Sequence, residues 1–283
     1  MNFKSVDTIH FIQNALKEDI RTGDHSSQAC IPSDATGKAK LLFKQSGVVA
    51  GIDLAKVILA QLSEEFIYQD FKADGDRVKP GELGFIVEGN VRAILAGERL
   101  LLNCMQRLSG IATYTDHLIQ LMGTSTSRLL DTRKTTPGMR ILEKWAVTVG
   151  GGHNHRIGLY DMIMLKDNHV DYCGGITKAV AKSRQYLISN MLKLPIEVET
   201  RNLEEVKEAL SCEGVNRVML DNFTPELIRE ALLLINGRVE TEASGGINEE
   251  NIAAYAATNV DFISIGALTH SVKSLDISLK EVD

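Results

Sequence analysis

The strongest constraint on the fold is a fixed interval between apolar segments in the second half of the chain. Four of these segments end at Glu199, Asp221, Ala243 and Ile265, which follow one another every 22 residues. That interval fits one buried strand followed by one crossover helix. Its repetition favours a parallel sheet, either as a barrel or as a doubly wound layer.

Six segments after residue 127 have the apolar character of buried strands. They are Arg128–Asp131, Met162–Lys166, Ile196–Glu199, Arg217–Asp221, Val239–Ala243 and Asp261–Ile265. Helices are expected to start at Thr136–Pro137 and Thr224–Pro225, where a capping Thr precedes a Pro, and at Asn202 and Asn248. Six strands favour an incomplete α/β barrel over a complete barrel of eight.

The first hundred residues carry a mixed α/β pattern. Short strands are expected at Lys40–Phe43 and Phe85–Val87, and a helix is expected to begin near Asp53. The stretch from Glu98 to Met122 predicts one or two helices, with Gly110 as the weak point, because glycine destabilises a helix interior by about 1 kcal/mol. The 283 residues allow one large domain or two of ordinary size.

Composition argues against several classes of protein. The net charge of −6 disfavours general nucleic-acid binding, although a cleft can still be locally basic. The four cysteines lack the spacing of a zinc or redox site, so we expect reduced thiols in a cytosolic protein. We expect neither a signal peptide nor a membrane span, because no apolar run has the required character or length.

Polar side chains follow the expected strands at the points where these strands end. Because the carboxyl ends of barrel strands open onto the face that holds active sites, these side chains are expected to meet. The segments are Asp131–Lys134, Lys166–His169, Glu197–Glu199, Asp221–Asn222 and Glu242–Gly246, and the last strand ends at Gly266. The alternative to a shared site is that each charge merely marks where its strand reaches the surface. This explanation is weaker for the whole set of strands than for any one strand.

Positive charge is concentrated in one stretch of this acidic chain. Residues 128–169 hold seven Lys or Arg side chains against four Asp or Glu. Such a cluster indicates an anionic ligand, and the fork of Arg suits carboxylates and phosphates. A solvated helix face would explain Arg140 and Lys144, but it does not explain Arg133 and Lys134, which directly follow a strand.

A glycine-rich loop, Gly150–Gly152, precedes His153, Asn154, His155 and Arg156 in the same stretch. Gly150 fits the end of a helix, and the other two glycines are expected to let the backbone approach a ligand. A zinc site at the two histidines is an alternative, but their spacing and the adjacent arginine argue against it.

Two acids and a glycine turn complete the expected site. Glu199 and Asp221 end successive strands, and neighbouring carboxylates at such a place suit Mg²⁺. The alternative is that both are structural acids that bond to loop amides. Ser244–Gly246, before an expected helix start at Asn248, is typical of a phosphate cradle. Gly266 ends the last strand, near the place where barrels commonly bind phosphate. Together these features indicate an enzyme that acts on a phosphosugar.

Several motifs follow one another in a specific order over nearly the whole chain. They are Glu98–Asn103, Asp131–Gly138, Gly150–Leu159, Lys166–His169, Glu197–Glu199, Met219–Asn222, Glu242–Gly246 and Gly266–Ser271, with a looser match at Glu18–Asp19 and Gly23–Asp24. This set resembles the quinolinate phosphoribosyltransferase family, also called nicotinate-nucleotide diphosphorylase (carboxylating). Cys104–Arg107 and Trp145 depart from the family pattern and are expected to be packing positions.

The resemblance implies a type II phosphoribosyltransferase architecture. An N-terminal α/β sandwich domain of residues 1–110 would precede an open α/β barrel of six to seven parallel strands, residues 111–270. The tail, residues 271–283, would return to the first domain. It also implies a cytoplasmic homodimer in which each N-terminal domain covers the partner's barrel, with assembly to a hexamer left open.

The implied reaction joins quinolinate to phosphoribosyl pyrophosphate with Mg²⁺ and gives nicotinate mononucleotide, pyrophosphate and CO₂. On the matching positions, the pyridine carboxylates would be bound by five side chains: Arg99 (from the partner subunit), Arg133, His155, Arg156 and Lys166. Lys134 would face the pyrophosphate, and Glu199 and Asp221 would hold Mg²⁺. The 5′-phosphate would lie on Ser244, Gly245, Gly246 and Gly266. The expected catalytic set is Lys134, Lys166, Glu199 and Asp221.

Two rival functions are considered. A paralogue found with molybdate transport shares the fold, and a non-catalytic sensor would bind a phosphorylated metabolite on the same barrel. The intact Lys166–His169 and Asn154–Arg156 motifs favour the quinolinate enzyme over the paralogue. Retention of both expected metal acids and of the basic positions argues against the sensor.

Overall fold

The computed structural model of the chain describes residues 1–282 and divides into two compact units. The first unit comprises Met1–Asp116, Thr136–Gly151 and the chain from Ser271 onward, and the second comprises His117–Thr135 and Gly152–His270. The first unit therefore includes a segment that lies well beyond residue 110 in the sequence. The domain boundaries expected from the sequence stay a prediction.

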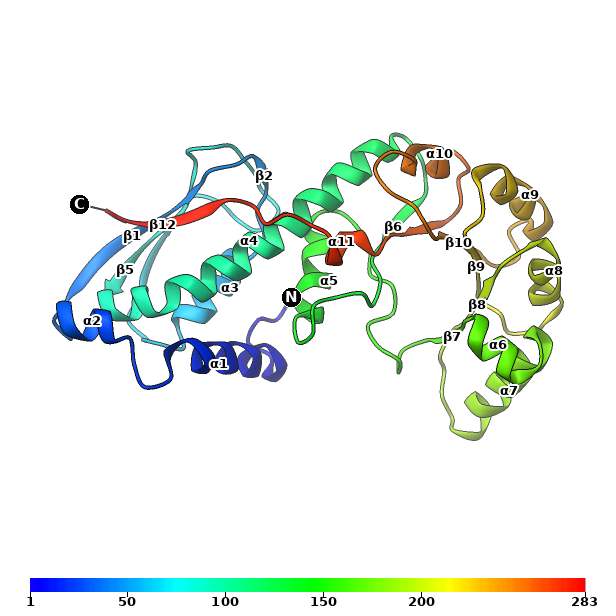
Figure 1. Cartoon of the computed structure of the whole chain (residues 1–283), viewed down its shortest axis with the longest axis horizontal. Helices are drawn as coiled ribbons and strands as arrows, with labels where there is room; N and C mark the ends of the chain where they lie inside the picture. Colours follow the sequence, from blue (N-terminus) through cyan, green and yellow to red (C-terminus); the bar gives the residue numbers. More distant parts are fainter. Residues whose placement is uncertain (283) are drawn as a thin grey trace. The chain divides into compact units, whose positions relative to one another are not determined.

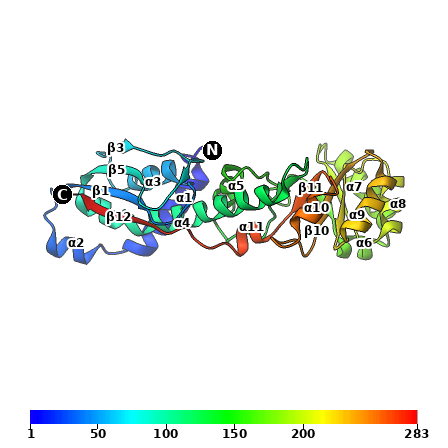
Figure 2. The ribbon, with the colours of Figure 1, turned by 90° about the horizontal axis from the view of Figure 1, so that it is seen from above.

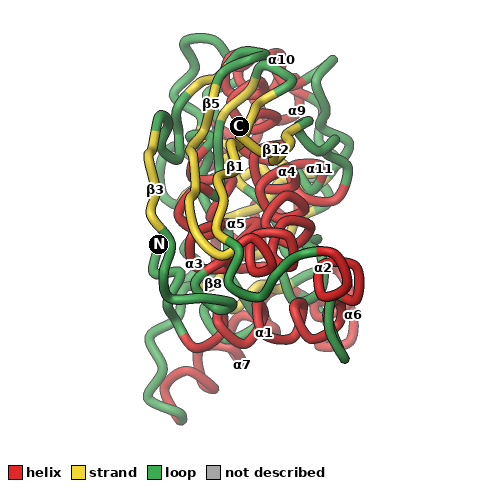
Figure 3. Tube along the Cα trace, turned by 90° about the vertical axis from the view of Figure 1, so that its left-hand side faces the viewer, coloured by secondary structure: helices red, strands yellow, loops and turns green. Residues whose placement is uncertain are grey.

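A four-stranded antiparallel sheet forms the first unit together with its helices, and Figure 3 shows several of its strands side by side. The strand order is β12 (Ile277–Val282), β1 (Thr36–Phe43), β5 (Leu83–Asn90) and β3 (Ile67–Asp70). A separate pair is formed by β2 (Gly47–Val48) and β4 (Arg77–Val78). Burial alternates along β1, so one face of this sheet packs inward while the other is exposed.

The C-terminal strand is held by this sheet. β12 pairs with β1 in an antiparallel register that runs from Lys38 opposite Val282 to Phe43 opposite Ile277.

The segments expected as strands at Lys40–Phe43 and Phe85–Val87 lie inside β1 and β5, which are longer. The helices of the unit are α1 (Val6–Ile20), α2 (His25–Cys30), α3 (Ile52–Leu59), α5 (Arg140–Val149) and most of α4 (Val91–Met122), whose residues from His117 onward belong to the second unit.

Helix α4 runs without a break through Gly110, which the sequence marked as a weak point. A Cβ atom on Gly110 would collide with the carbonyl oxygen of Lys273, so glycine is needed there for a close approach between two parts of the chain. The neighbouring Leu108, Ile111 and Ala112 are fully buried. Their burial outweighs the cost of about 1 kcal/mol that glycine imposes on a helix interior.

Replacing Gly110 by Ala should therefore destabilise the protein, although alanine is the better helix former. We expect the free energy of unfolding to fall by about 1–3 kcal/mol, because the added methyl group forces the Lys273 segment away. Urea unfolding followed by circular dichroism measures this change. Arg99→Ala, at an exposed position of the same helix, is the matched control and should leave stability nearly unchanged. A stabilised Gly110→Ala variant would contradict the explanation.

Six parallel strands form the sheet of the second unit, which confirms the expected number and type of strands (Figure 1). Their order in the sheet is β6 (Arg128–Leu130), β11 (Phe262–Ser264), β10 (Glu240–Ser244), β9 (Arg217–Asp221), β8 (Ile196–Thr200) and β7 (Ile163–Leu165). Strands β6 and β7 are the two edges, so the sheet is an open barrel. A single bridge between Leu130 and His153 extends the pairing beyond β6.

Helices pack on the outside of this sheet, as α7, α8 and α9 show in Figures 1 and 2. The helices of the unit are α6 (Asp167–Cys173), α7 (Ile176–Ser189), α8 (Leu203–Ser211), α9 (Pro225–Ile235), α10 (Ile252–Ala256) and α11 (Ala267–His270). Side chains alternate along each strand, so Val198 and Val218 face the helices. Glu197 and Arg217 face the interior of the barrel, which is therefore unusually polar.

Two of the four expected helix starts are confirmed. The side chains of Asn202 and Thr224 accept hydrogen bonds from the amides of Glu205 and Leu227, at the starts of α8 and α9. The other two were wrong. Helix α5 begins at Arg140, because Thr136 to Met139 form a turn and a carboxylate oxygen of Glu143 accepts the Thr136 amide instead.

The expected start at Asn248 was the second error. Helix α10 begins at Ile252, and its N-cap is Asn251. The side chain of Asn248 accepts a hydrogen bond from the Glu250 amide, which stabilises a local turn and competes with a helix at that position.

Two expectations about the whole chain can be compared with the structure. All four cysteines are free, and burial raises the pKa of Cys104 to about 12. Among residues 1–282 no helix has both the length and the apolar character needed to cross a membrane.

Candidate active site

A cavity of about 710 Å³ opens in the second unit, within the size range of small-molecule sites. Residues that end or directly follow the parallel strands form much of its wall, as expected for a barrel site. Its lining includes ten of the residues singled out in the sequence: Arg133, Lys134, His155, Arg156, Lys166, Asp221, Ser244, Gly245, Gly246 and Gly266. Glu199 lies behind this lining and contacts Lys166.

Four cations converge on the cavity, namely Arg133, Lys134, Arg156 and Lys166. Nε of Arg133 is buried, and it has no hydrogen-bond partner among residues 1–282. Burial, followed by the charge of Arg133, lowers the pKa of Arg156. Cations that line one cavity and leave a buried donor unpaired are suited to an anionic ligand.

The position of Lys134 depends on the loop after β11. The Thr269 hydroxyl donates a hydrogen bond to the Lys134 carbonyl oxygen at 2.8 Å. A Cβ atom on Gly266 would lie 2.9 Å from Cδ of Lys134. Gly266 therefore leaves room for the Lys134 side chain, a packing role that the sequence alone did not reveal.

Lys166 lies at the junction between β7 and α6, where it is the N-cap residue. Its amide donates to Nδ1 of His169 at 3.1 Å, which fixes the start of the helix. Its Nζ donates to Oε2 of Glu199 at 2.7 Å. Glu199 is buried and Lys166 is about half-exposed, so the carboxylate orients an ammonium group that still faces the cavity.

Two carboxylates lie at the ends of neighbouring strands, Glu199 on β8 and Asp221 on β9. Burial, followed by the charge of Glu199, raises the pKa of Asp221, and the charges of Lys166 and Lys134 oppose this effect. The pair supplies the oxygen donors that Mg²⁺ prefers. These residues therefore fit a magnesium ion, although one oxygen of Glu199 also accepts the Lys166 hydrogen bond.

The turn after β10 exposes backbone amides at the cavity. Gly245 and Gly246 have φ angles of +94° and +66°, which favour glycine. A Cβ atom on Gly245 would also collide with the side chain of Asn222. The backbone amide of Asn222 donates a hydrogen bond to the Ser244 carbonyl oxygen. Helix α10 starts only at Ile252, so the helix start predicted at Asn248 is absent from the expected phosphate cradle. The amides of the turn are what the cradle has to offer a phosphate.

The glycine-rich loop has a role different from the expected one. A Cβ atom on Gly150 would collide with the carbonyl oxygen of Ala112, so this glycine allows α4 and the end of α5 to pack closely. Gly151 and Gly152 are not among the residues that line the cavity. The expectation that they bring backbone to a ligand is therefore not supported by the arrangement.

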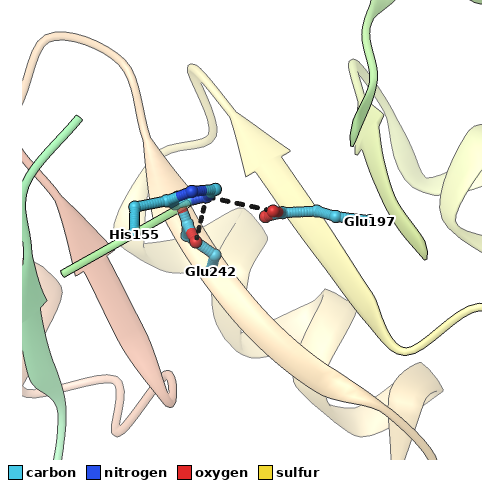
Figure 4. A group of neighbouring side chains, drawn as sticks. All are labelled: His155, Glu197 and Glu242. Atoms are coloured by element: carbon cyan, nitrogen blue, oxygen red, sulfur yellow. Dashed lines mark ion pairs between the residues drawn. The ribbon is translucent and has the colours of Figure 1, made fainter. Parts of the chain in front are cut away.

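The zinc alternative at His153 and His155 is also not supported. His153 is exposed, whereas His155 is buried beside Glu197 and Glu242 (Figure 4). Nε2 of His155 is 3.0 Å from Oε2 of Glu197 and 3.4 Å from Oε2 of Glu242. The sequence suggested a ligand-binding histidine, and the structure adds two buried acids that contact it.

Burial and charge act in opposite directions on these three groups. Burial lowers the pKa of His155, but the two carboxylates outweigh it and raise that pKa to about 9. Burial and the charge of Glu242 raise the pKa of Glu197. Burial also opposes ionisation of Glu242, but the proximity of His155 and the charge of Arg217 prevail and lower its pKa.

Arg99 is the one predicted binding residue that lies in the first unit. It is exposed on α4 and is not among the residues that line the cavity. Other lining residues were not singled out as binding positions, among them Thr132, Asn222, Glu242, Ser264 and His270. The period-two alternation along β10 and β11 was the signal that could have revealed Glu242 and Ser264, because it places them on the interior face.

Comparison with known families decides the relationship. A family model described as the C-terminal domain of quinolinate phosphoribosyl transferase matches residues 111–280, and the corresponding N-terminal model matches residues 24–109. The chain belongs to this family. The fold expected from the resemblance is thereby confirmed, including the separate antiparallel and parallel sheets.

Relatives in the quinolinate phosphoribosyltransferase family match most of the chain. A mitochondrial quinolinate phosphoribosyltransferase [decarboxylating] of Nicotiana glauca is 45% identical and covers 95% of this chain, with 80% of its own length matched. A probable nicotinate-nucleotide pyrophosphorylase [carboxylating] of Bacillus subtilis is 44% identical. The match covers 93% of this chain and 89% of the Bacillus protein.

Solved structures of the family agree with the fold. NadC from Streptococcus pyogenes superposes with a TM-score of 0.91 at 39% identity, covering 97% of both chains. The nicotinate-nucleotide pyrophosphorylase of Francisella tularensis gives a TM-score of 0.91 at 40% identity, with 99% of this chain and 98% of that chain covered.

Proposed function

We propose that this protein transfers the phosphoribosyl group of phosphoribosyl pyrophosphate to quinolinate and releases pyrophosphate, CO₂ and nicotinate mononucleotide, a step of NAD biosynthesis. The observation that carries this proposal is the convergence of Arg133, Lys134, Arg156 and Lys166 on one cavity, beside the glycine turn at residues 245–246. Family membership supports the same reaction.

The charges of the substrates fit this cavity. Quinolinate is a dianion, and phosphoribosyl pyrophosphate carries several more negative charges, so both require fixed cations. Arg133 and Arg156 line the same cavity, where they would bind the two ring carboxylates, and the unpaired Nε of Arg133 provides a donor. Lys166, oriented by Glu199, supplies a third cation for the ring carboxylates. We assign His155 to the same region of the site.

Lys134 and the turn would hold the phosphosugar. Lys134 faces the same cavity as the turn, where it would offset the charge of the pyrophosphate. Ser244, Gly245 and Gly246 would donate to the 5′-phosphate, and Gly266 would keep Lys134 in position. In this assignment the pyridine nitrogen would lie on one side of the ribose and the departing pyrophosphate on the other.

The bond changes follow from this placement. The pyridine nitrogen forms a bond to C1′ of the ribose, while the bond from C1′ to the pyrophosphate oxygen breaks and that oxygen keeps the electron pair. Orientation and cation charge lower the barrier to this step. The bond from C2 to its carboxylate then breaks, CO₂ leaves, and the electron pair left on C2 takes up a proton.

A magnesium ion fits the same proposal. Glu199 and Asp221 would hold it, directly or through water, next to the cavity. When bound, Mg²⁺ would neutralise negative charge on the pyrophosphate as it departs.

Arg99 would complete the site of a partner subunit. Its guanidinium is exposed on α4 of the first unit, where it is available to a second copy of the chain. We propose a homodimer with composite sites, with further assembly to a hexamer as the alternative. A cytoplasmic location is part of the same proposal.

A coupled assay tests the proposed reaction. We expect pyrophosphate and CO₂ to form in equal amounts from quinolinate and phosphoribosyl pyrophosphate. Both signals should disappear when EDTA removes divalent ions and return when excess Mg²⁺ is added, because pyrophosphate needs charge neutralisation. Nicotinate in place of quinolinate is the matched substrate control and should give no pyrophosphate.

The rivals give different results in this assay. Turnover of nicotinate without turnover of quinolinate would contradict the substrate assignment. Binding of phosphoribosyl pyrophosphate with no product from any pyridine carboxylate would favour the sensor. Full activity in the presence of EDTA would contradict the role given to Glu199 and Asp221.

A further inference from the structure

The interior of the barrel contains a buried ionic network that the proposed reaction does not explain. It joins His155, from the loop after the Leu130–His153 bridge, to Glu197 on β8 and Glu242 on β10 (Figure 4). Nη1 of Arg217, on β9, is 3.1 Å from Oε2 of Glu242. Both glutamate side chains are fully buried, so these groups have each other in place of solvent.

Both ring nitrogens of His155 are engaged inside the protein. Nε2 faces the carboxylates of Glu197 and Glu242. Nδ1 accepts a hydrogen bond from the amide of Arg156 at 2.7 Å. The backbone amide of His155 donates to Oδ1 of Asp131 at 2.9 Å. The ring is therefore fixed from three directions, and neither nitrogen can bind a ligand unless it first gives up one of these contacts.

The Nδ1 contact determines which nitrogen carries the proton of the neutral ring. An acceptor of an N–H group needs a free lone pair, so Nδ1 is unprotonated and the proton lies on Nε2. The two carboxylates lie 3.0 Å and 3.4 Å from Nε2, so their charge favours a proton on that nitrogen. A second proton would place two N–H groups 2.7 Å apart, and because the carboxylates raise the pKa of His155 to about 9, the contact is fully formed in the neutral ring above that pH.

We propose that Glu197 and Glu242 are positioning residues, which hold His155 so that its Nδ1 fixes the backbone of Arg156 at the wall of the cavity. This inference rests on the proposed function for the role of Arg156 toward the ring carboxylates. It replaces the direct binding role expected from the sequence for His155, which lines the cavity but has both ring nitrogens in contacts inside the protein.

A metal ion held by the same three side chains is the alternative. His155, Glu197 and Glu242 each offer one ligand atom, and these atoms lie within 4.8 Å of one another. However, the guanidinium of Arg217 already donates to Oε2 of Glu242. A fixed cation at that distance repels a divalent ion, so a hydrogen-bonded network explains the cluster better.

The first experiment reads the histidine ring directly. Nitrogen-15 NMR of the wild-type protein at about pH 10, where a ring with a pKa of about 9 is neutral, should show an unprotonated Nδ1 and a protonated Nε2, with the His155 signals assigned from their loss in His155→Asn. Glu197→Gln and Glu242→Gln should each shift the Nε2 signal. Glu240→Gln is the matched control. Glu240 is exposed on β10, the strand of Glu242, and of the groups in the network it pairs only with Arg217. A protonated Nδ1, or signals indifferent to both glutamine variants, would overturn the inference.

The second experiment measures the consequence for binding. Glu197→Gln and Glu242→Gln should each raise the KM for quinolinate about tenfold, the usual scale for residues that orient a binding group. The KM for phosphoribosyl pyrophosphate and the kcat should change far less, whereas general damage to the fold would affect all three. Glu240→Gln should resemble the wild type. Equal losses in both KM values and in kcat would argue against a positioning role.

The two measurements separate failure of the inference from failure of the proposed function. A wild-type protein that does not convert quinolinate would disprove the function, and the NMR result would still decide whether the network holds the ring. If a glutamine variant does not fold, the wild-type spectrum alone provides the decisive test. Addition of Zn²⁺ or Mn²⁺ should leave the His155 signals unchanged, and a specific shift would favour the metal site.

Discussion

Lys166→Ala should abolish turnover while the protein stays folded. We expect kcat/KM for quinolinate to fall by about 10³-fold or more, because the variant loses a cation from the cavity and leaves Glu199 without its 2.7 Å partner. Pyrophosphate release measures the loss. Circular dichroism should show an unchanged fold, since the Lys166 side chain is about half-exposed.

Two further variants test the explanation. Lys166→Arg retains the charge but not the shape of the ammonium group, so it should recover only part of the activity. Lys182→Ala removes an exposed lysine from α7 and should behave as the wild type. If Lys166→Ala retained wild-type kinetics, the role assigned to this residue would be wrong.

Arg99→Ala and Lys134→Ala, each inactive alone, should recover activity when they are mixed. In the proposed dimer, Arg99 of one subunit completes the site that contains Lys134 of the other. A mixed dimer then has one site with both side chains intact. After complete subunit exchange, about a quarter of all sites should be intact, which follows from the symmetry of the dimer.

The mixing experiment also tests the assembly. Activity should increase with time as subunits exchange, and sedimentation should show at least a dimer. Mixing Lys134→Ala with Lys166→Ala is the matched control, because both changes lie in the same unit and mixed dimers should restore no site. A fully active monomer would rule out the composite site.

The parallel sheet could be predicted because its signal is local and repeated. Each strand–helix unit carries its own apolar period and turn, and the recurrence of Glu199, Asp221, Ala243 and Ile265 exposes the unit length. The convergence of Arg133, Lys134, Arg156 and Lys166 followed from the same reasoning, since the carboxyl ends of parallel strands share one face.

Other features depend on contacts that no local pattern contains. Gly110 looked like a break because its partner, Lys273, is distant in the sequence. Thr136 looked like a helix cap because nothing nearby indicates that Glu143 accepts its amide. Glu197 and Glu242 were assigned to strand ends, whereas alternation places them inside the barrel, where their burial depends on His155 from another loop.

The charged barrel interior also limits how this sequence can diverge. Loss of Arg217 would remove the guanidinium that lies 3.1 Å from Glu242, and loss of either glutamate would remove a carboxylate that faces His155. Removing one member of a buried ionic network lowers the free energy of unfolding far more than replacing all of its members together. Across homologues we therefore expect these four positions to covary, so that each lineage keeps the complete quartet or replaces it jointly.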